Sequence, residues 1–399
     1  MRILILPGND WIFGPQQYLH DLAEKLGKKH DVFVWHFNLF RNRKPCLQKI
    51  ENVRLIRPWS VYSSNLLVYY GVNFLPHSIS FARIVRKLGI DVVIVANLIP
   101  ALWAFSLTPK RVLKVFAFQD YFPESASTYY KNFPRTFCRI LESFAYLVNK
   151  LSLKLANLAL CPCFSLINLA EKMGCKRNYF LPNGVDTNFF DPKKSNPKLG
   201  EELGLSKHTL VFYGLIENWL DFETVFAGFK ILKEEFPSAK LLIVGSTLTN
   251  HTKVLENLVQ DENLTKDIVL TGYVPNELVP YYLNLGNICL MPYKTDTFSG
   301  KIRLPLKLFI YSAMGKTVLS VPLPEVKRLN PKHVFFYNDK ESFARQASMI
   351  FRNKNLQDDL TYHAREFSKN FDYFKIAQEC EAILEKNICH HKGLLRTEN

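Results

Sequence analysis

Residues 209–245 read TLVFYGLIENWLDFETVFAGFKILKEEFPSAKLLIVG. The segment begins and ends with short runs rich in apolar and β-branched residues, TLVFYG and KLLIVG, which are typical of buried strands. Between them, the stretch from Leu220 to Glu235 is typical of a helix, which Asp221 is placed to cap. A strand, a helix and a second strand in direct succession predict a parallel βαβ unit.

The same alternation extends along the chain in both directions. Strands are expected at residues 3–6, 32–37, 53–56, 92–96, 112–118, 267–274, 287–292 and 317–322, and helices near 15–26, 78–88, 134–156, 355–370 and 373–388. The pattern restarts after Pro182. The sequence therefore predicts an α/β protein with two Rossmann-like, doubly wound lobes that face a central cleft. The first would comprise residues 1–180 with a returning helix near 372–390, and the second residues 181–371.

The charge of the chain favours an anionic partner. The 399 residues include 51 Lys and Arg against 36 Asp and Glu, a formal net charge of +15. A phosphorylated small molecule, an anionic membrane face and nucleic acid are all candidates, and a merely soluble basic surface is the alternative. Nucleic acid is not expected, because the basic residues are dispersed and no recognised nucleic-acid-binding motif occurs.

Cysteine usage and apolar runs predict a cytoplasmic chain. The eight cysteines are scattered and form no C-x-x-C pair, so reduced thiols are expected. The Cys389-His390-His391 tail is better explained as a frayed terminus than as a metal site. The opening MRILILPGND does not resemble a signal peptide, and the longest apolar stretch, 92–107, is too short to span a membrane.

Two loops after predicted strands of the first lobe could carry function. PGNDWIFGPQQY, residues 7–18, contains Gly8 and Gly14, and its helix start could meet an anion or a sugar. A plain tight connection explains it equally well. FQDYFPES, residues 118–125, contains Asp120 and Glu124. A carboxylate there could orient an acceptor hydroxyl or share its proton, and capping of a turn is the alternative.

A third loop, in the second lobe, gathers positive charge at a helix start. In YKTDTFSGKIRLPLKLF, residues 293–309, Ser299 and Gly300 are expected to form a flexible loop. Lys301, Arg303 and Lys307 precede or open a helix predicted over Pro305 to Met314. Backbone donors, a positive helix dipole and cationic side chains would suit a diphosphate. A solvated basic loop is the alternative.

With these segments in order, the chain resembles the GT4-type glycosyltransferases of the GT-B fold. The resemblance covers nearly the whole length and is strongest in LPNGVDTNFF, KLLIVG, IVLTGYVPNELVPYYLNLGNICLMPY and PLKLFIYSAMGKTV. The last follows the family pattern P-x-K-L-F-E-Y-x-A-x-G-K-P. GPQQYL and GLIENWLDFE are similar to a subgroup with P-Q-x-L near the start and a W-hydrophobic-D segment.

The resemblance implies transfer of a sugar from a nucleotide donor to a hydroxyl acceptor, with retained configuration and no essential metal or cofactor. It implies that Lys307 and the N–H groups around Leu308 hold the diphosphate and that Gly14 faces it from the first lobe. Gly214, Ser299, Gly300, Lys301 and Arg303 complete the expected donor site. Asp120 is expected near the acceptor and the reacting sugar, as the catalytic residue.

The chain departs from the family pattern at four positions, one of which is Thr317 in place of the final proline. The glutamate that usually grips the ribose falls on Ile310, its partner eight residues earlier falls on Ile302, and an arginine common after the first glycine of the second lobe is Leu215. Three interpretations remain open: the nucleotide is held differently, the donor is unusual, or catalysis is lost and the protein is a binding or scaffold module. A nucleotide-sugar epimerase or another GT-B enzyme is a further alternative.

A basic chain with many aromatic residues also suits a peripheral enzyme at the inner face of an anionic membrane, with a lipid-linked or cell-surface glycan as acceptor. The expected contacts are Trp59, Tyr62, Tyr69 and Tyr70 among Arg54, Arg57 and Arg83.

Overall fold

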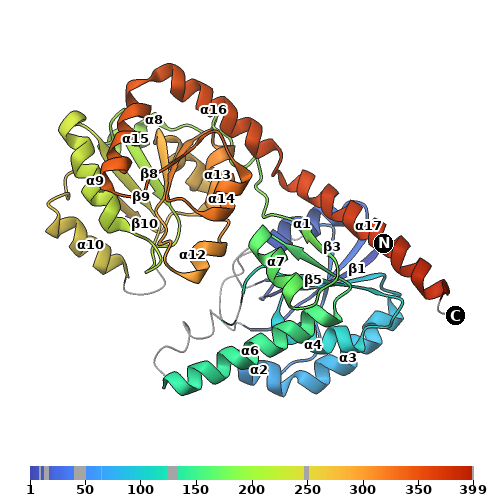
Figure 1. Ribbon diagram of the computed structural model, residues 1–399. Coiled ribbons are helices and arrows are strands. Elements are labelled where there is room, and N and C mark those ends of the chain that lie inside the picture. The colour runs from blue at the N-terminus through green and yellow to red at the C-terminus, as the bar shows by residue number, and fades with distance from the viewer. Residues whose placement is uncertain are drawn as a thin grey trace. The chain divides into compact units, whose positions relative to one another are not determined.

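The chain folds into two compact units (Figure 1). The structure is a computed structural model that describes residues 1–8, 10–12, 18–39, 51–63, 65–121, 123, 134–246 and 251–397. Unit 1 comprises Met1–Asn183 and Tyr373–Asn399, and unit 2 comprises Gly184–Asp372. Each unit is built on its own parallel sheet.

Within the described residues, the sheet of unit 1 has seven parallel strands in the order β3-β2-β1-β4-β5-β6-β7. These are β1 Arg2–Leu6, β2 Asp31–Trp35, β3 Val53–Ile56, β4 Val92–Val95, β5 Leu113–Ala117, β6 Leu158–Cys161 and β7 Asn178–Phe180. The order reverses between β1 and β4, which makes the carboxyl ends of these two strands the topological switch point of unit 1.

Helices cover both faces of this sheet, as right-handed crossovers require. The described helices of unit 1 are α1 Tyr18–Gly27, α2 Leu66–Val72, α3 Phe74–Lys87, α4 Leu98–Leu107, α6 Arg135–Leu155, α7 Phe164–Lys172 and α17 Tyr373–Thr397. Helices α3 and α6 both pack against α4, whereas α17 packs against α1. Figure 1 shows α3, α4 and α6 on one side of the strands and α1 and α17 on the other.

The sheet of unit 2 has six parallel strands among the described residues, in the order β10-β9-β8-β11-β12-β13. They are β8 Thr209–Tyr213, β9 Lys240–Val244, β10 Ile268–Gly272, β11 Ile288–Met291, β12 Thr317–Ser320 and β13 Val334–Phe336. The helices are α8 Pro197–Glu202, α9 Phe222–Glu235, α10 His251–Asp261, α11 Val279–Asn284, α12 Phe298–Ile302, α13 Leu306–Ala313, α14 Pro324–Leu329, α15 Lys340–Arg352 and α16 Lys354–Lys369. The switch point of unit 2 lies between β8 and β11.

The predicted fold class, two Rossmann-like doubly wound sheets, is confirmed. One local expectation is wrong: Ser299 and Gly300 do not form a flexible loop but belong to the short helix α12. The Thr297 side chain caps this helix by accepting a hydrogen bond from the Gly300 N–H at 3.0 Å. Gly14 and Glu124 lie outside the described residues. Among the helices that are described, none is both long and apolar enough to cross a membrane.

A buried histidine, His333, is hydrogen-bonded to helix α13 through Ser312. His333 Nε2 lies 2.7 Å from Ser312 Oγ, which in turn donates to the Leu308 carbonyl at 2.6 Å. Because the serine hydroxyl has one proton, Nε2–H of His333 must be the donor between the two side chains. Burial, with a smaller effect from His363, lowers the pKa of His333 to about 3. The ring is therefore neutral in the folded protein at neutral pH.

This histidine predicts acid destabilisation of unit 2. The unfolded chain takes up the proton near pH 6.5 but the folded chain only near pH 3, so stability falls as the pH drops below 6.5. The slope should be about 1.4 kcal/mol per pH unit from this residue. Urea unfolding at pH 7 and pH 5 measures it. His333→Gln should flatten the pH dependence by about one proton, and His390→Gln, an exposed control, should not. Equal slopes in both variants would contradict the assignment.

Candidate functional site

Ligands of doubly wound sheets bind beyond the carboxyl ends of the strands at the switch point. In unit 2 this places the candidate site at the ends of β8 and β11. The two strands are joined there by one side chain: the buried Tyr311 hydroxyl accepts from the Tyr213 N–H at 3.0 Å and donates to the Leu290 carbonyl at 3.3 Å. Burial raises the pKa of Tyr311 well above its ordinary value, so the donor proton is retained.

Glycines keep the adjoining strand ends free of side chains. Gly214, Gly245 and Gly272 follow or end β8, β9 and β10, with φ of +127°, +147° and +67°. The Gly214 N–H donates to the Val244 carbonyl, and the Gly245 N–H donates to the Gly272 carbonyl. A Cβ on Gly245 would lie 2.0 Å from the Gly214 carbonyl oxygen. Only glycine fits this backbone approach, which exposes peptide groups rather than side chains to a ligand.

The side chain of Lys307 extends over the backbone of these glycines. A Cβ on Gly214 would lie only 2.6 Å from Lys307 Nζ, so the ammonium group occupies the space that the missing side chain leaves. Nζ is 3.4 Å from Tyr293 Oη and 5.2 Å from the centre of the Phe212 ring. Lys307 is also the second residue of α13, where the first backbone N–H groups have no partner within the helix. An ammonium group and a helix N-terminus therefore converge at the switch point.

Leu308 contributes no unpaired backbone N–H to the candidate site. Its N–H donates to the Pro305 carbonyl at 3.1 Å, so this donor is already used in closing the first turn. The side chain of Leu308 is buried in the core. The helix donors left for an anion are those of Leu306 and Lys307, two residues and one residue earlier.

Arg303 supplies a second cation beside Lys307. Its guanidinium carbon lies 5.1 Å from the centre of the Tyr293 ring and 5.5 Å from that of Trp219. The Tyr293 ring thus contacts both cations, since Lys307 Nζ is 5.6 Å from its centre. Cation–π contacts of this kind orient a cation without neutralising its charge. Tyr293 was not identified from the sequence, although its place directly after a buried strand was a usable signal.

The loops after β8 and β11 are tied to each other. The Asp221 N–H donates to the Pro292 carbonyl at 2.8 Å, and the Lys294 N–H donates to the Trp219 carbonyl at 2.9 Å. The expected helix cap is confirmed, because the Asp221 side chain accepts from the Thr224 N–H at 3.1 Å. Trp219 therefore has a fixed backbone and an Arg303 contact at its ring.

The other residues expected in the donor site are distributed differently. Lys301 is exposed on α12, and Gly300 is buried where a Cβ would lie 2.3 Å from the Lys294 carbonyl oxygen. Ser299 lies in the same helix. Ile310 is only 7% exposed and belongs to the apolar core of unit 2. The candidate site is therefore cationic at the start of α13, and the Ile310 side chain belongs to the core.

The switch point of unit 1 contains a polar cluster that the sequence analysis missed. Asp10 is fully buried, and its carboxylate accepts from the N–H groups of Ile12 and Leu39 at 3.0 and 2.9 Å. His36 Nδ1 lies 3.6 Å from the same carboxylate. Burial lowers the pKa of His36, although the charge of Asp10 opposes that shift. An acidic residue four positions after the end of the first buried strand was the available signal.

Asp120, the expected catalytic residue, is exposed just beyond β5. Its charge contributes to the raised pKa of Tyr18, for which burial is the main cause. Asp120 is thus close to the start of α1.

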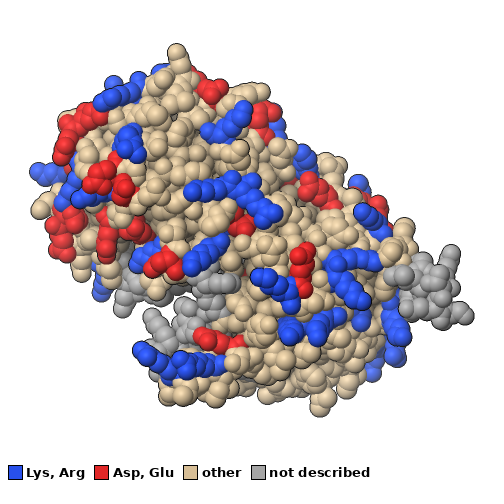
Figure 2. Space-filling model, viewed as in Figure 1, with Lys and Arg blue, Asp and Glu red and all other residues tan. Residues whose placement is uncertain are grey.

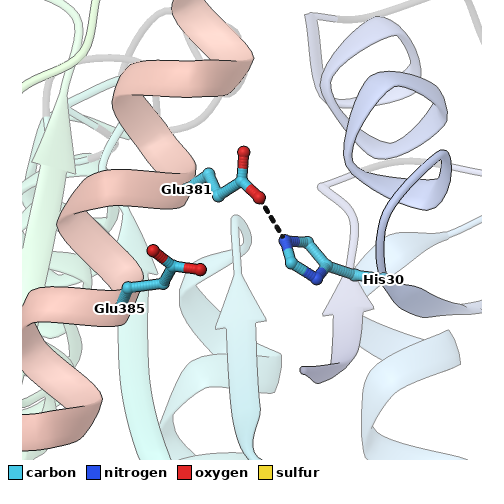
Figure 3. Close-up of side chains that lie close together, drawn as sticks. All are labelled: His30, Glu381 and Glu385. Atoms are coloured by element: carbon cyan, nitrogen blue, oxygen red, sulfur yellow. Dashed lines mark ion pairs between the residues drawn. The ribbon is translucent and has the colours of Figure 1, made fainter.

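One cluster of possible metal ligands occurs among the residues that are described. His30, Glu381 and Glu385 place ligand atoms within 4.8 Å of one another (Figure 3). Glu381 is already engaged: its Oε1 lies 3.0 Å from His30 Nε2 and its Oε2 lies 2.9 Å from Lys29 Nζ. The ammonium group of Lys29 would oppose a cation here, so the cluster is better explained as the tie between α17 and the end of α1.

Comparisons with known proteins find glycosyltransferases among the relatives of the chain. Two family models match the chain: Glycosyltransferase Family 4 over residues 13–189 and Glycosyl transferases group 1 over residues 207–353. A curated relative from Bacillus subtilis (strain 168), named for teichuronic acid biosynthesis as the glycosyltransferase TuaH, is 30% identical over 167 residues. That match spans 41% of this chain and 39% of the relative.

Solved structures extend the likeness to the whole fold. Sucrose-phosphate synthase from Thermosynechococcus elongatus has a TM-score of 0.74 at 16% identity and covers 98% of this chain and 100% of its own. HepE from Anabaena, solved with UDP-glucose, has a TM-score of 0.70 at 14% identity over 97% and 100%. WaaG, a glycosyltransferase involved in lipopolysaccharide biosynthesis, has a TM-score of 0.64 at 14% identity over 96% and 99%. The chain thus contains a Glycosyltransferase Family 4 domain and a Glycosyl transferases group 1 domain, and its two Rossmann-like units have the GT-B fold of these solved glycosyltransferases.

Proposed function

We propose that the protein transfers a sugar, with retained configuration, from a nucleoside-diphosphate sugar to a hydroxyl acceptor. The observation that carries this proposal is the position of Lys307 Nζ, which lies over the side-chain-free backbone of Gly214 at the switch point of unit 2. A lysine and a helix N-terminus aimed at one place suit a diphosphate. The solved HepE structures with UDP and UDP-glucose support a donor of this class.

The proposed mechanism rests on charge that develops on the leaving group. As the sugar–phosphate bond breaks, negative charge builds on the nucleoside diphosphate. Lys307 and the first N–H groups of α13 are held in place before the reaction and stabilise that charge electrostatically. Arg303, oriented by Tyr293 and Trp219, adds a second cation. Because two fixed cations face the leaving group, we propose that no metal ion or other cofactor is needed.

The acceptor side is assigned to unit 1. Asp120 would orient the acceptor hydroxyl or take up its proton, which requires an accessible carboxylate. Asp120 meets this requirement, since it is exposed at the end of β5. We propose a lipid-linked or cell-surface glycan as acceptor and a peripheral position at the cytoplasmic face of the membrane. The names of TuaH and WaaG, which refer to cell-envelope polymers, support this class of acceptor.

A second candidate function is a non-catalytic module that binds a nucleotide sugar or glycan. Ile310 favours it, because this buried side chain cannot hydrogen-bond a ribose. Leu215, which is exposed beside Gly214, favours it as well. The two candidates differ in turnover: slow hydrolysis or transfer of a bound donor would exclude the non-catalytic module, and saturable binding without turnover would favour it.

Replacement of Lys307 by Ala should weaken nucleotide binding. We expect calorimetric titration with UDP, GDP, ADP, CMP and dTDP to show saturable binding of one nucleotide. Lys307→Ala should weaken it roughly tenfold or more, because a hydrogen bond to a charged group contributes ~1.5–3 kcal/mol. Lys340→Ala, which removes an exposed lysine of the same unit, is the matched control. Equal affinities in the two variants would refute the site.

Gly214→Ala should have a similar effect by displacing the same lysine. The added Cβ would meet Lys307 Nζ at 2.6 Å and Cε at 2.8 Å. A loss of stability of about 1 kcal/mol is also expected, because φ of +127° strains alanine. Gly204→Ala is the control, since Gly204 also has positive φ but no atom within 4 Å of its Cβ position. Unchanged nucleotide affinity in Gly214→Ala would show that Lys307 need not lie there.

Asp120→Asn should separate binding from chemistry. The amide keeps the shape of the side chain but cannot accept a proton, so turnover should fall by about 10²-fold or more. Nucleotide affinity measured by calorimetry should stay within a factor of two of the parent, because Asp120 is assigned to the acceptor side. Unchanged turnover would remove Asp120 from the mechanism, and lost affinity would instead place it at the donor.

A further inference from the structure

The excess positive charge of the protein resides almost entirely on unit 1. Unit 1 contains 28 Lys and Arg against 14 Asp and Glu, whereas unit 2 contains 23 against 22. Residues 52–90, which include β3, α2 and α3, contain five basic residues and no acidic residue. Such an asymmetry is an electrostatic property of one unit rather than of the whole surface, and it points to an anionic partner for unit 1.

Helix α6 carries an unusual apolar row. Its exposed large apolar residues are Phe137, Ile140, Phe144, Leu147 and Leu151, hereafter the α6 stripe. The spacings of three and four residues place all five on one side of the helix. The buried residues of α6 begin only at Val148, so the first thirteen residues of the helix contain four of the five stripe residues and no buried side chain. Ile140 is 65% exposed.

Helices α2 and α3 add a second exposed apolar group. Its members are Leu66, Val68, Val72, Phe74, Leu75 and Ile79, of which Leu75 is 67% exposed. Trp59, in the preceding segment, is 70% exposed, as the sequence analysis expected. Tyr69 and Tyr70 were wrongly expected at this surface. Both are buried, with Tyr69 Oη accepting from the Asn38 N–H and Tyr70 Oη accepting from Asn97.

The two apolar groups belong to the same side of unit 1. Helices α3 and α6 both pack against α4, which is buried beneath them, and α2 packs against α3. Basic residues accompany them: Arg83, Arg86 and Lys87 on α3, and Arg135, Arg139, Lys150 and Lys154 on α6. Figure 2, in the view of Figure 1, shows Lys and Arg side chains near both ends of the stretch that α6 covers, with other residues between them.

We propose that this α2–α3–α6 face docks onto an anionic lipid bilayer, with its apolar side chains in the headgroup–acyl boundary and its cations on lipid phosphates. Apolar rows bordered by Lys and Arg suit that boundary, which accepts both kinds of group. Nucleic acid would leave the exposed Phe, Ile and Leu side chains without a partner. A second copy is disfavoured because two units with the same large positive charge would repel each other.

This inference adds to the proposed function the surface that would bring a lipid-linked acceptor to unit 1. It rests on that function only for its biological purpose, because the docking itself requires neither donor nor turnover. Docking and nucleotide binding can therefore be measured separately on the same purified chain.

Flotation with lipid vesicles tests the proposal. The full chain should bind vesicles of phosphatidylcholine with phosphatidylglycerol, bind at least tenfold less to pure phosphatidylcholine, and be released as salt is raised. Ile140→Glu should weaken binding at least tenfold, and Leu75→Glu should weaken it as well. Val254→Glu, on α10 of unit 2, is the matched control because Val254 is also an apolar residue with 60% exposure.

Vesicle binding and nucleotide affinity of Ile140→Glu together decide whether the α6 stripe contacts lipid. Nucleotide affinity unchanged in Ile140→Glu shows that the variant is folded and separates lost docking from a lost donor site. Equal vesicle binding by Ile140→Glu and Val254→Glu, or no binding to anionic vesicles at low salt, would overturn the proposal. It would also be overturned if the chain sediments as a dimer that Ile140→Glu dissociates, because a second copy would then be the partner that covers this face.

Discussion

The candidate site depends on the approach of Lys307 to the backbone of Gly214. A lysine side chain has considerable conformational freedom, and its position is fixed only because three neighbours restrict it: the bare backbone beneath, and the rings of Phe212 and Tyr293 beside it. None of these neighbours is acidic. The ammonium group is therefore oriented while its charge remains available, which is the condition for electrostatic stabilisation of a second charge brought by a ligand.

That geometry requires a rigid frame, which unit 2 supplies through buried polar contacts. Tyr311 links the ends of β8 and β11 from the middle of α13, and His333 holds Ser312, the next residue. The helix that carries Lys307 is thereby fixed to both strands of the switch point. Because these hydroxyl and imidazole groups are buried, breaking one contact leaves an unsatisfied polar group, so the arrangement resists small displacements.

The order of strands and helices could be predicted from local sequence because each element carries its own apolar periodicity. The contacts that build the site could not: Tyr311 meets Tyr213 across 98 positions, and Lys307 meets Gly214 at a similar separation. Where prediction failed locally, tertiary or capping effects explain it. Ser299 and Gly300 were expected in a flexible loop, but Thr297 caps a short helix that contains both residues. Tyr69 and Tyr70 were expected at a membrane interface, but their positions on α2 place both side chains in the core.

The apolar residue at 310 has a consequence for Lys307. The two positions are three residues apart and therefore neighbours on α13, so the carboxylate that the family pattern places at 310 would lie within reach of the ammonium group. It would partly neutralise that group in the absence of ligand. Ile310 is instead buried in the core, and Lys307 faces aromatic rings. Helix α13 contains no acidic residue, so the positive charge of Lys307 is not neutralised from within its own helix.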